Sequence, residues 1–282
     1  MKITVRSIIK TILTVILIVG LLFLGIRWLE DYRSRQEYDS AEQIAIGTHT
    51  EAIEETEVEN PQQSAFEVQP EETETQQNDA ALSDPNVSYL LDMDLDALQE
   101  VNDDVIGWLY VPDTRISYPL VQGTDNSYYL KHTWMDKANF AGAIFMEYQN
   151  SPDLSDFNTI IYGHNMNNKT MFGALREYRY AGYWEEHPSI YVLVDGGVYR
   201  YDVFSMREAS VKSITYAMQI ETPEKKEEFI QFALNYSNFE TGLVPTVKDK
   251  ILTLSTCSGS GYETRWVVQG ILNKEGSYKI PD

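Results

Sequence analysis

The chain has 282 residues, of which 43 are acidic and 22 are basic, giving a formal net charge of −21. An acidic surplus of this size argues against a nucleic-acid-binding protein, because phosphate contacts need a basic surface. The single cysteine, Cys257, excludes an intramolecular disulfide and a CxxC metal or redox site, while 43% hydrophobic residues are enough for a folded core.

The charge divides the chain into three segments. Residues 1–35 carry six basic and two acidic side chains, and residues 36–86 carry fourteen acidic and no basic ones. Residues 87–282 carry the remaining 16 basic and 27 acidic side chains. The chain therefore has a basic start, a strongly acidic middle and a moderately acidic remainder.

Residues 8–28 are predicted to cross a membrane. The apolar run reaches about 21 residues, or about 31 Å of helix, which is enough to span a bilayer. A cleaved signal peptide has a similar pattern, but no small-x-small cleavage site follows this run. We therefore expect an uncleaved signal anchor in the cell membrane, with residues 1–7 as a cytoplasmic tail and the rest of the chain extracellular.

Residues 29–86 are predicted to be a disordered acidic tether. From about residue 37 the sequence is rich in Glu, Gln, Thr and Ser, has few aromatic residues and lacks sustained helix or strand periodicity. Such a stretch buries too little apolar surface to offset its ordering entropy, and its like charges repel. A linker of this kind would hold the following domain away from the membrane.

Residues 87–282 are predicted to form one folded, mainly β domain. Apolar residues at helical spacing predict an amphipathic helix over 91–105, and Thr222 as N-cap followed by Pro223 opens a second helix late in the domain. Eight strand-like runs lie between turn residues: IGWLYVP, RISYPLVQ, GAIFMEY, NTIIYGHN, SIYVLV, VYRYDVFSM, KILTLSTC and RWVVQGIL. This pattern predicts a β-barrel or sandwich with peripheral helices.

Three residues at the ends of these runs are candidates for chemistry. Cys257 ends LTLSTC, His164 follows NTIIYG, and Arg265 begins RWVVQGIL. Taken singly, a lone cysteine is more often an inert core residue, and a histidine at a strand end more often a structural hydrogen-bonding group. If the loop after Cys257 folds back as a hairpin connection, Cys257 and Arg265 face the same end of the sheet. Together with His164 they would form an acyl-transfer site.

The sequence from about Asp103 to Leu272 resembles the class B sortases. The resemblance is carried by DVIGWLYVP, ISYPLVQGTDNSYYL, GAIFMEYQN, NTIIYGHNMNNKTMFGAL and LTLSTC followed by RWVVQGIL. It implies a closed eight-stranded β-barrel with an amino-terminal helix and peripheral helices. It also implies a cysteine transpeptidase on the outer face of a Gram-positive membrane, which joins secreted proteins bearing a sorting signal to an amine of peptidoglycan or its lipid-linked precursor.

The resemblance also assigns catalytic roles. Cys257 matches the nucleophile that attacks the threonine carbonyl of the sorting signal and forms a thioester. His164 matches the general acid and base. Arg265 matches the guanidinium that orients the substrate and helps to stabilise the oxyanion, with the backbone N–H of Ser258 as the second donor.

Further positions match the family's substrate pocket. These residues are Asn126, Leu130, Tyr162, Ser255 and Ser258. Tyr162 fits a packed strand aromatic equally well. The loop near residues 210–216 is also expected to line the pocket, but the sequence alone does not assign its residues.

Two alternatives stay open at this point. A sortase that polymerises pili would use a lysine of another subunit as its acceptor, and a catalytically silent binding module could use the same barrel. No cofactor is expected, and no metal site, because His49, His132 and His187 lack a partner at ligand spacing. The sequence around Ser260 lacks the full GxSxG pattern of a serine hydrolase.

Overall fold

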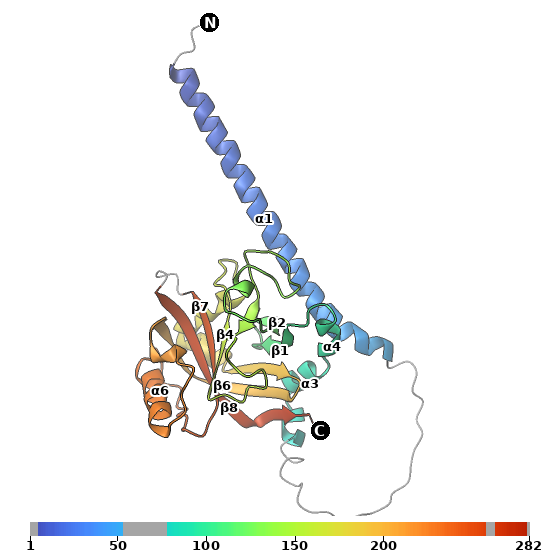
Figure 1. Cartoon of the computed structure of the whole chain (residues 1–282), viewed down its shortest axis with the longest axis vertical. Coiled ribbons are helices and arrows are strands. Elements are labelled where there is room, and N and C mark those ends of the chain that lie inside the picture. Colours follow the sequence, from blue (N-terminus) through green and yellow to red (C-terminus); the bar gives the residue numbers. More distant parts are fainter. Residues whose placement is uncertain (1–4, 53–77, 258–262, 281–282) are drawn as a thin grey trace, which may run out of the picture.

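Eight strands close into a barrel in the computed structural model, which describes residues 5–52, 78–257 and 263–280 (Figure 1). Around the barrel the order is β1-β2-β3-β4-β7-β8-β6-β5, and β5 pairs with β1. The strands are β1 Val105–Tyr110, β2 Ser117–Val121, β3 Ile144–Met146, β4 Asn158–Tyr162, β5 Ser189–Val194, β6 Gly197–Ser210, β7 Ile251–Cys257 and β8 Thr264–Lys279. The predicted fold class is confirmed, and each of the eight strand-like runs contributes one strand.

Two strand pairs decide where the strand ends meet. β4 and β7 are parallel neighbours, with Tyr162 opposite Ser255, so their carboxyl ends reach the same rim of the barrel. β7 and β8 are antiparallel and end with Cys257 opposite Arg265. The end of β4, the end of β7 and the start of β8 therefore lie side by side at one rim.

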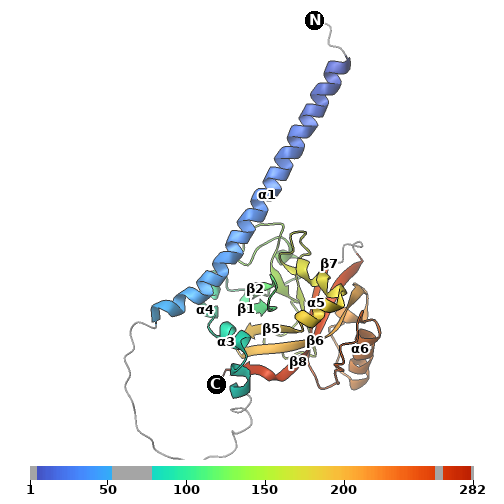
Figure 2. The ribbon, with the colours of Figure 1, turned by 180° about the vertical axis from the view of Figure 1, so that it is seen from behind.

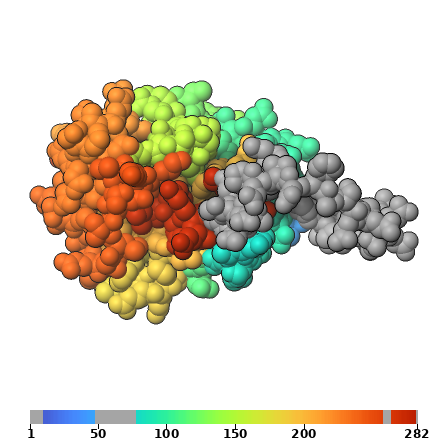
Figure 3. Space-filling model, turned by 90° about the horizontal axis from the view of Figure 1, so that it is seen from below, coloured from blue at the N-terminus to red at the C-terminus, as the bar shows by residue number. Residues whose placement is uncertain are grey.

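The helices surround this barrel. Those of the folded domain are α3 Pro85–Leu91, α4 Leu95–Gln99, α5 Ala181–Glu186, α6 Pro223–Asn235 and the 3-10 helices η2 Tyr128–Leu130, η3 Phe172–Arg179 and η4 Ile214–Tyr216. The predicted late helix is confirmed as α6: the Thr222 side chain accepts a hydrogen bond from the backbone N–H of Lys225. α6 buries Phe229, Ile230 and Ala233 and, with its neighbours in orange, forms one end of the domain (Figure 3).

The single helix predicted over residues 91–105 is wrong. The structure has two short helices, α3 and α4, instead. Asp94 interrupts the segment because its backbone is extended and its carboxylate accepts a hydrogen bond from the N–H of Ala97, which makes it the N-cap of a new helix. The apolar spacing is retained, but the capping residue divides it.

α1, Val5–Ala52, is the longest element of the chain. It is the one helix among the described residues that is long and apolar enough to cross a membrane, and its apolar side chains between Ile12 and Trp28 are at least half exposed. It continues past the predicted end of the span at Trp28 and runs along the side of the barrel near β1, β2 and α4 (Figure 2).

The tether predicted over residues 29–86 differs from the structure at both ends. Residues 29–52 are helical within α1, residues 78–82 are helical, and α3 begins at Pro85; residues 53–77 lie outside the described residues. Four residues at helical spacing bury one face of α1 against the domain: Ser34, Tyr38, Ala41 and Ala45. The composition of this segment does not indicate a buried helix face, because two of the four residues are alanines and the surrounding residues are acidic.

Candidate active site

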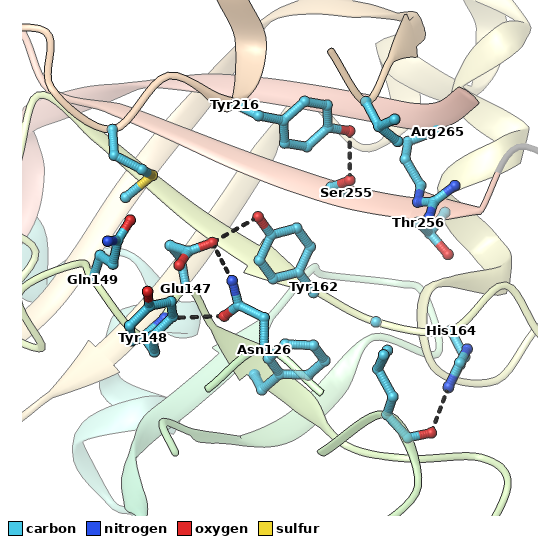
Figure 4. A pocket seen from close by; sticks show the side chains of 15 residues that line it. Asn126, Glu147, Tyr148, Gln149, Tyr162, His164, Tyr216, Ser255, Thr256 and Arg265 are labelled. Carbon is cyan, nitrogen blue, oxygen red and sulfur yellow. Dashed lines mark hydrogen bonds between the residues drawn. The ribbon is translucent and has the colours of Figure 1, made fainter. Parts of the chain in front are cut away.

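A pocket of about 450 Å³ opens at the rim where β4, β7 and β8 meet (Figure 4). Six of the predicted site residues line it: Asn126, Leu130, Tyr162, His164, Ser255 and Arg265. Cys257 is the residue that follows the pocket-lining Thr256 on β7. Ser258 lies outside the described residues. Residues spread over about 140 positions of the sequence thus share one pocket.

Arg265 reaches the pocket from the start of β8, where it is the second residue of the strand. Its Cα pairs with that of Cys257, as expected if the intervening loop connects two antiparallel strands. Its Nη1 donates a hydrogen bond to the carbonyl of Thr264 at 2.9 Å. Figure 4 shows Arg265 and His164 at one end of the pocket. A guanidinium there supplies planar hydrogen-bond donors next to the end of β7.

His164 is held by backbone contacts. Its Nε2 lies 2.8 Å from the carbonyl oxygen of Leu130, and because a carbonyl only accepts, Nε2 is the nitrogen that carries the hydrogen (Figure 4). Gly142 packs against the ring: a Cβ built on this glycine would lie 3.0 Å from His164 Cδ2. The backbone on one side of His164 therefore fixes both its tautomer and its position.

A buried carboxylate lies further along the pocket. Glu147 is 5% exposed, and its Oε2 accepts hydrogen bonds from Asn126 Nδ2 at 2.6 Å and from the Tyr162 hydroxyl at 2.9 Å (Figure 4). Burial, and then the charge of Glu147, raise the pKa of Tyr162 well above its usual range. The phenol therefore remains a neutral hydrogen-bond donor. The Tyr162 ring also packs on Phe145, so it is both a pocket residue and a packed strand aromatic.

The opposite wall comes from the segment between β6 and α6. Val211, Tyr216 and Met218 line the pocket, and the Tyr216 hydroxyl lies 2.8 Å from Ser255 Oγ. These residues specify the wall that the sequence located only as the loop near residues 210–216.

A buried arginine holds this wall in place. Arg207 is 1% exposed and donates hydrogen bonds to Ser205 Oγ, Gln269 Oε1 and Thr215 Oγ1. Its burial lowers its pKa to about 10. Asn158 Nδ2 donates to the carbonyl of Thr215, so η4, which carries Tyr216, is fixed from two sides.

Sequence reasoning missed Glu147 and Arg207. A signal was present for each: Glu147 is a charged residue directly after the apolar run AIFM, and Arg207 lies in the long run that forms β6. Charged residues within such runs are buried only when they have hydrogen-bond partners. The partners of Glu147 lie 21 and 15 residues away, and those of Arg207 include Gln269, 62 residues away.

The barrel is that of a sortase. A model of the sortase domain matches residues 109–273, and the chain belongs to the sortase family. Within that family it is a class B sortase, a cysteine transpeptidase, because its curated relatives are sortase B proteins.

Three comparisons measure this relationship. Sortase B of Listeria monocytogenes is 34% identical over an alignment of 224 residues that covers 74% of this chain and 90% of the relative. Sortase B of Staphylococcus aureus is 31% identical over 169 residues, 60% of this chain and 69% of the relative. A structure of a Staphylococcus aureus sortase B–substrate complex has a TM-score of 0.68 at 25% identity, covering 87% of this chain and 98% of that one.

Proposed function

We propose that this sortase cleaves a carboxy-terminal sorting signal after threonine and transfers the protein to an amine of peptidoglycan or its precursor. The observation that carries the proposal is the meeting of β4, β7 and β8, which places the Cα of Cys257 opposite that of Arg265 beside the pocket lined by His164. Acyl transfer requires a nucleophile, a general acid and base that moves protons, and hydrogen-bond donors for the oxyanion.

The first half-reaction forms an acyl-enzyme. The thiolate of Cys257 attacks the carbonyl carbon of threonine, and the oxyanion accepts hydrogen bonds from Arg265 and from the backbone N–H of Ser258. The C–N bond then breaks, and His164 gives its proton to the leaving amine. Because Nε2 donates to the Leu130 carbonyl, Nδ1 is the nitrogen that exchanges this proton.

The second half-reaction transfers the acyl group. His164 Nδ1 takes a proton from the incoming amine, which attacks the thioester carbon. The C–S bond breaks, the Cys257 thiolate is restored and a new amide bond joins the protein to its acceptor. His164 therefore ends the cycle with the proton that it needs to begin the next one.

The elongated pocket supports a peptide substrate. His164 and Arg265 occupy the reacting end, while Asn126, Tyr162 and Glu147 supply polar groups further along it. The related Staphylococcus aureus structure is a complex with substrate, which supports a sorting-signal substrate in general. Leu130 and Ser255 add an apolar contact and a hydroxyl to the same surface.

The apolar part of α1 supports a membrane location. A single-pass anchor at residues 8–28 would leave residues 1–7 in the cytoplasm and the barrel outside the cell, where sorting signals and cell-wall amines are found. Its apolar side chains from Ile12 to Trp28 are at least half exposed, as expected for a surface in contact with lipid.

Trapping the acyl-enzyme tests the proposal. The full-length protein in detergent is incubated with NPxTN-like and PxTG-like peptides, and its intact mass is measured. We expect an adduct equal to the peptide up to threonine, absent in Cys257→Ala. No adduct with any of these peptides, or an adduct that persists in Cys257→Ala, contradicts the mechanism.

The acceptor is tested separately. Amines related to peptidoglycan cross-bridges are expected to release the adduct faster than water does. If a lysine-containing pilin peptide releases it faster than those amines, the enzyme is instead a pilus-polymerising sortase.

A further inference from the structure

The half of α1 that follows the apolar run contacts the two loops that flank His164. One loop, residues 130–143, runs from the last residue of η2 to β3. The other, residues 164–172, begins with His164 itself, shortly after β4, and ends at the first residue of η3. Both loops lie outside the eight barrel strands, and side-chain contacts add to the backbone hydrogen bonds that they form. Several of those contacts come from a helix that begins more than 100 residues earlier in the chain.

Tyr38 makes the central contact to the first loop. Its hydroxyl donates a hydrogen bond of 2.6 Å to the carbonyl of Gly142, and the pair is buried. Two neighbouring contacts tie the same loop to α1: Trp134 Nε1 donates to the carbonyl of Glu37, and Asn139 Nδ2 to that of Glu30. The 130–143 loop is thus attached to α1 near its start, its middle and its end.

Gly142 transmits this attachment to His164. Gly142 has a φ of +61°, and a Cβ built on it would lie 2.6 Å from the carbonyl oxygen of Tyr129. This position therefore has no room for a side chain. The same built Cβ lies 3.0 Å from His164 Cδ2 and 3.0 Å from the Leu130 carbonyl oxygen, the atom that accepts from His164 Nε2. A displacement of Gly142 would therefore move the support of the imidazole ring and the acceptor of its hydrogen bond.

The second loop is attached to α1 as well. The Tyr38 ring packs edge-on against Tyr118, at 5.1 Å between ring centres, and the Tyr118 hydroxyl accepts a hydrogen bond from the N–H of Met171. Met171 has a φ of 51°, a conformation that costs energy and persists only where its surroundings enforce it. Closer to the membrane, Asn168 Nδ2 donates to Asp31 Oδ1 at 2.6 Å.

We propose, building on the proposed role of His164, that residues 30–47 of α1 are a structural part of the active site and that Tyr38 is a positioning residue for His164. Tyr38 touches no reacting atom. It fixes the 130–143 loop through Gly142 and supports the 164–172 loop through Tyr118, so the histidine is held between two loops that share one anchor point.

The consequence is that membrane anchoring and catalysis use one continuous element. The same helix that carries the apolar run holds the histidine loops, without an intervening linker between residues 5 and 52. The barrel is thereby fixed with respect to α1, and the pocket has a defined orientation relative to the helix that would cross the membrane.

The test compares two Tyr→Phe substitutions in the full-length protein, reconstituted in lipid nanodiscs. Tyr38→Phe removes the hydrogen bond to Gly142 but retains the ring. Tyr89→Phe is the matched control, because Tyr89 also makes a hydrogen bond to α1, through Glu42, but touches neither histidine loop. The measured quantities are kcat and KM for transfer of a sorting peptide to an amine.

We expect Tyr38→Phe to lower kcat at least about fivefold, which corresponds to one ordinary hydrogen bond, with KM within about twofold. Tyr89→Phe should leave both constants within about twofold of wild type. Asp31→Ala, which releases Asn168 of the second loop, should lower kcat in the same way. A purely structural role would lower the amount of active protein and affect both Tyr→Phe variants according to their stability.

His164→Ala distinguishes a failure of the proposed role of His164 from a failure of the proposed positioning role of α1. If His164→Ala retains wild-type turnover, the proposed role of His164 is wrong. If it abolishes turnover while Tyr38→Phe and Asp31→Ala both match Tyr89→Phe, the positioning role of α1 is overturned and the proposed function stands.

Discussion

Cys257 and Arg265 occupy one rung of the sheet, with their Cα atoms paired across β7 and β8. The Cα atoms of such a pair lie about 5 Å apart, far closer than the ends of an extended segment with seven intervening residues, so the chain must turn between them. The arginine is therefore set beside the proposed nucleophile by strand register, and no long-range packing is needed to bring the two together.

Arg265→Lys is expected to lower kcat about 100- to 1000-fold. Lysine retains the positive charge but lacks the planar fork that can donate to an oxyanion and to the substrate backbone at once, so the loss should fall on the transition state. Steady-state kinetics of transpeptidation measure it. Arg179→Lys is the control, since Arg179 stacks on Tyr180 away from the pocket. A kcat for Arg265→Lys equal to that of the control would show that the fork has no role.

Glu147→Gln is expected to act on substrate binding. The change removes the buried charge at the part of the pocket away from His164, so KM for the sorting peptide should rise about tenfold while kcat stays within about twofold. Peptide titration and steady-state kinetics provide the measurement. Glu185→Gln, an exposed change on α5, is the control.

The same variant has a spectroscopic consequence. The charge of Glu147 is one cause of the raised pKa of Tyr162, so its removal should lower that pKa toward the usual value. NMR of ring-labelled tyrosine over a pH series follows the phenol directly. An unchanged Tyr162 titration in Glu147→Gln would mean that burial alone sets its pKa.

The strands could be predicted from sequence because their information is local. Each run alternates or is continuously apolar between turn residues, and the eight runs became the eight strands. The pairing of Cys257 with Arg265 at the proposed catalytic rim followed from the same pattern, since these two residues lie on either side of the loop that joins β7 to β8. His164 reached that rim because β4 and β7 are parallel neighbours, which the sequence alone does not specify.

Apart from the helix that Asp94 divides through a local cap, the errors concern contacts between distant segments. The buried face of α1 contains Ala41 and Ala45, whose small side chains give little hydrophobic signal, and its partners lie about 100 residues later. Glu147 is similar: its carboxylate is buried because Asn126 and Tyr162 converge on it. Composition indicates how much apolar surface a segment can bury by itself. It therefore underestimates the order of a segment that folds by packing on the surface of another part of the protein.

Gly142→Ala is expected to impair both stability and turnover. The positive φ and the close approach of the Tyr129 carbonyl should cost about 1–3 kcal/mol of unfolding free energy, and the new methyl group should displace His164 and lower kcat. Gly182→Ala is the matched control, because a Cβ at Gly182 meets nothing within 4 Å and alanine favours the helix. Thermal unfolding and turnover are measured on the same samples. Equal kcat values for the two variants would contradict the contact between Gly142 and His164.

The raised pKa of Tyr118 predicts a loss of stability at alkaline pH. Burial raises its pKa in the folded protein to about 12, against about 10 in the unfolded chain. Between these values the unfolded state has lost the proton and the folded state retains it, so the unfolding free energy falls as pH rises from about 10 to about 12. The contribution of this pKa difference to the unfolding free energy is fully present below pH 10, and it amounts to about 2–3 kcal/mol.

Tyr118→Phe removes this titration. The variant should be less stable at neutral pH, by about 1–3 kcal/mol, because the N–H of Met171 loses its acceptor. Its unfolding free energy should then fall less steeply than that of wild type above pH 10, by up to about 1.4 kcal/mol per pH unit for one proton. Denaturant unfolding in detergent at several pH values measures both slopes. Ile116→Val, a buried change beside Tyr118 that removes no ionisable group, should lower stability without changing the slope. If Tyr118→Phe and Ile116→Val have the same slope, Tyr118 does not titrate differently in the folded and unfolded states.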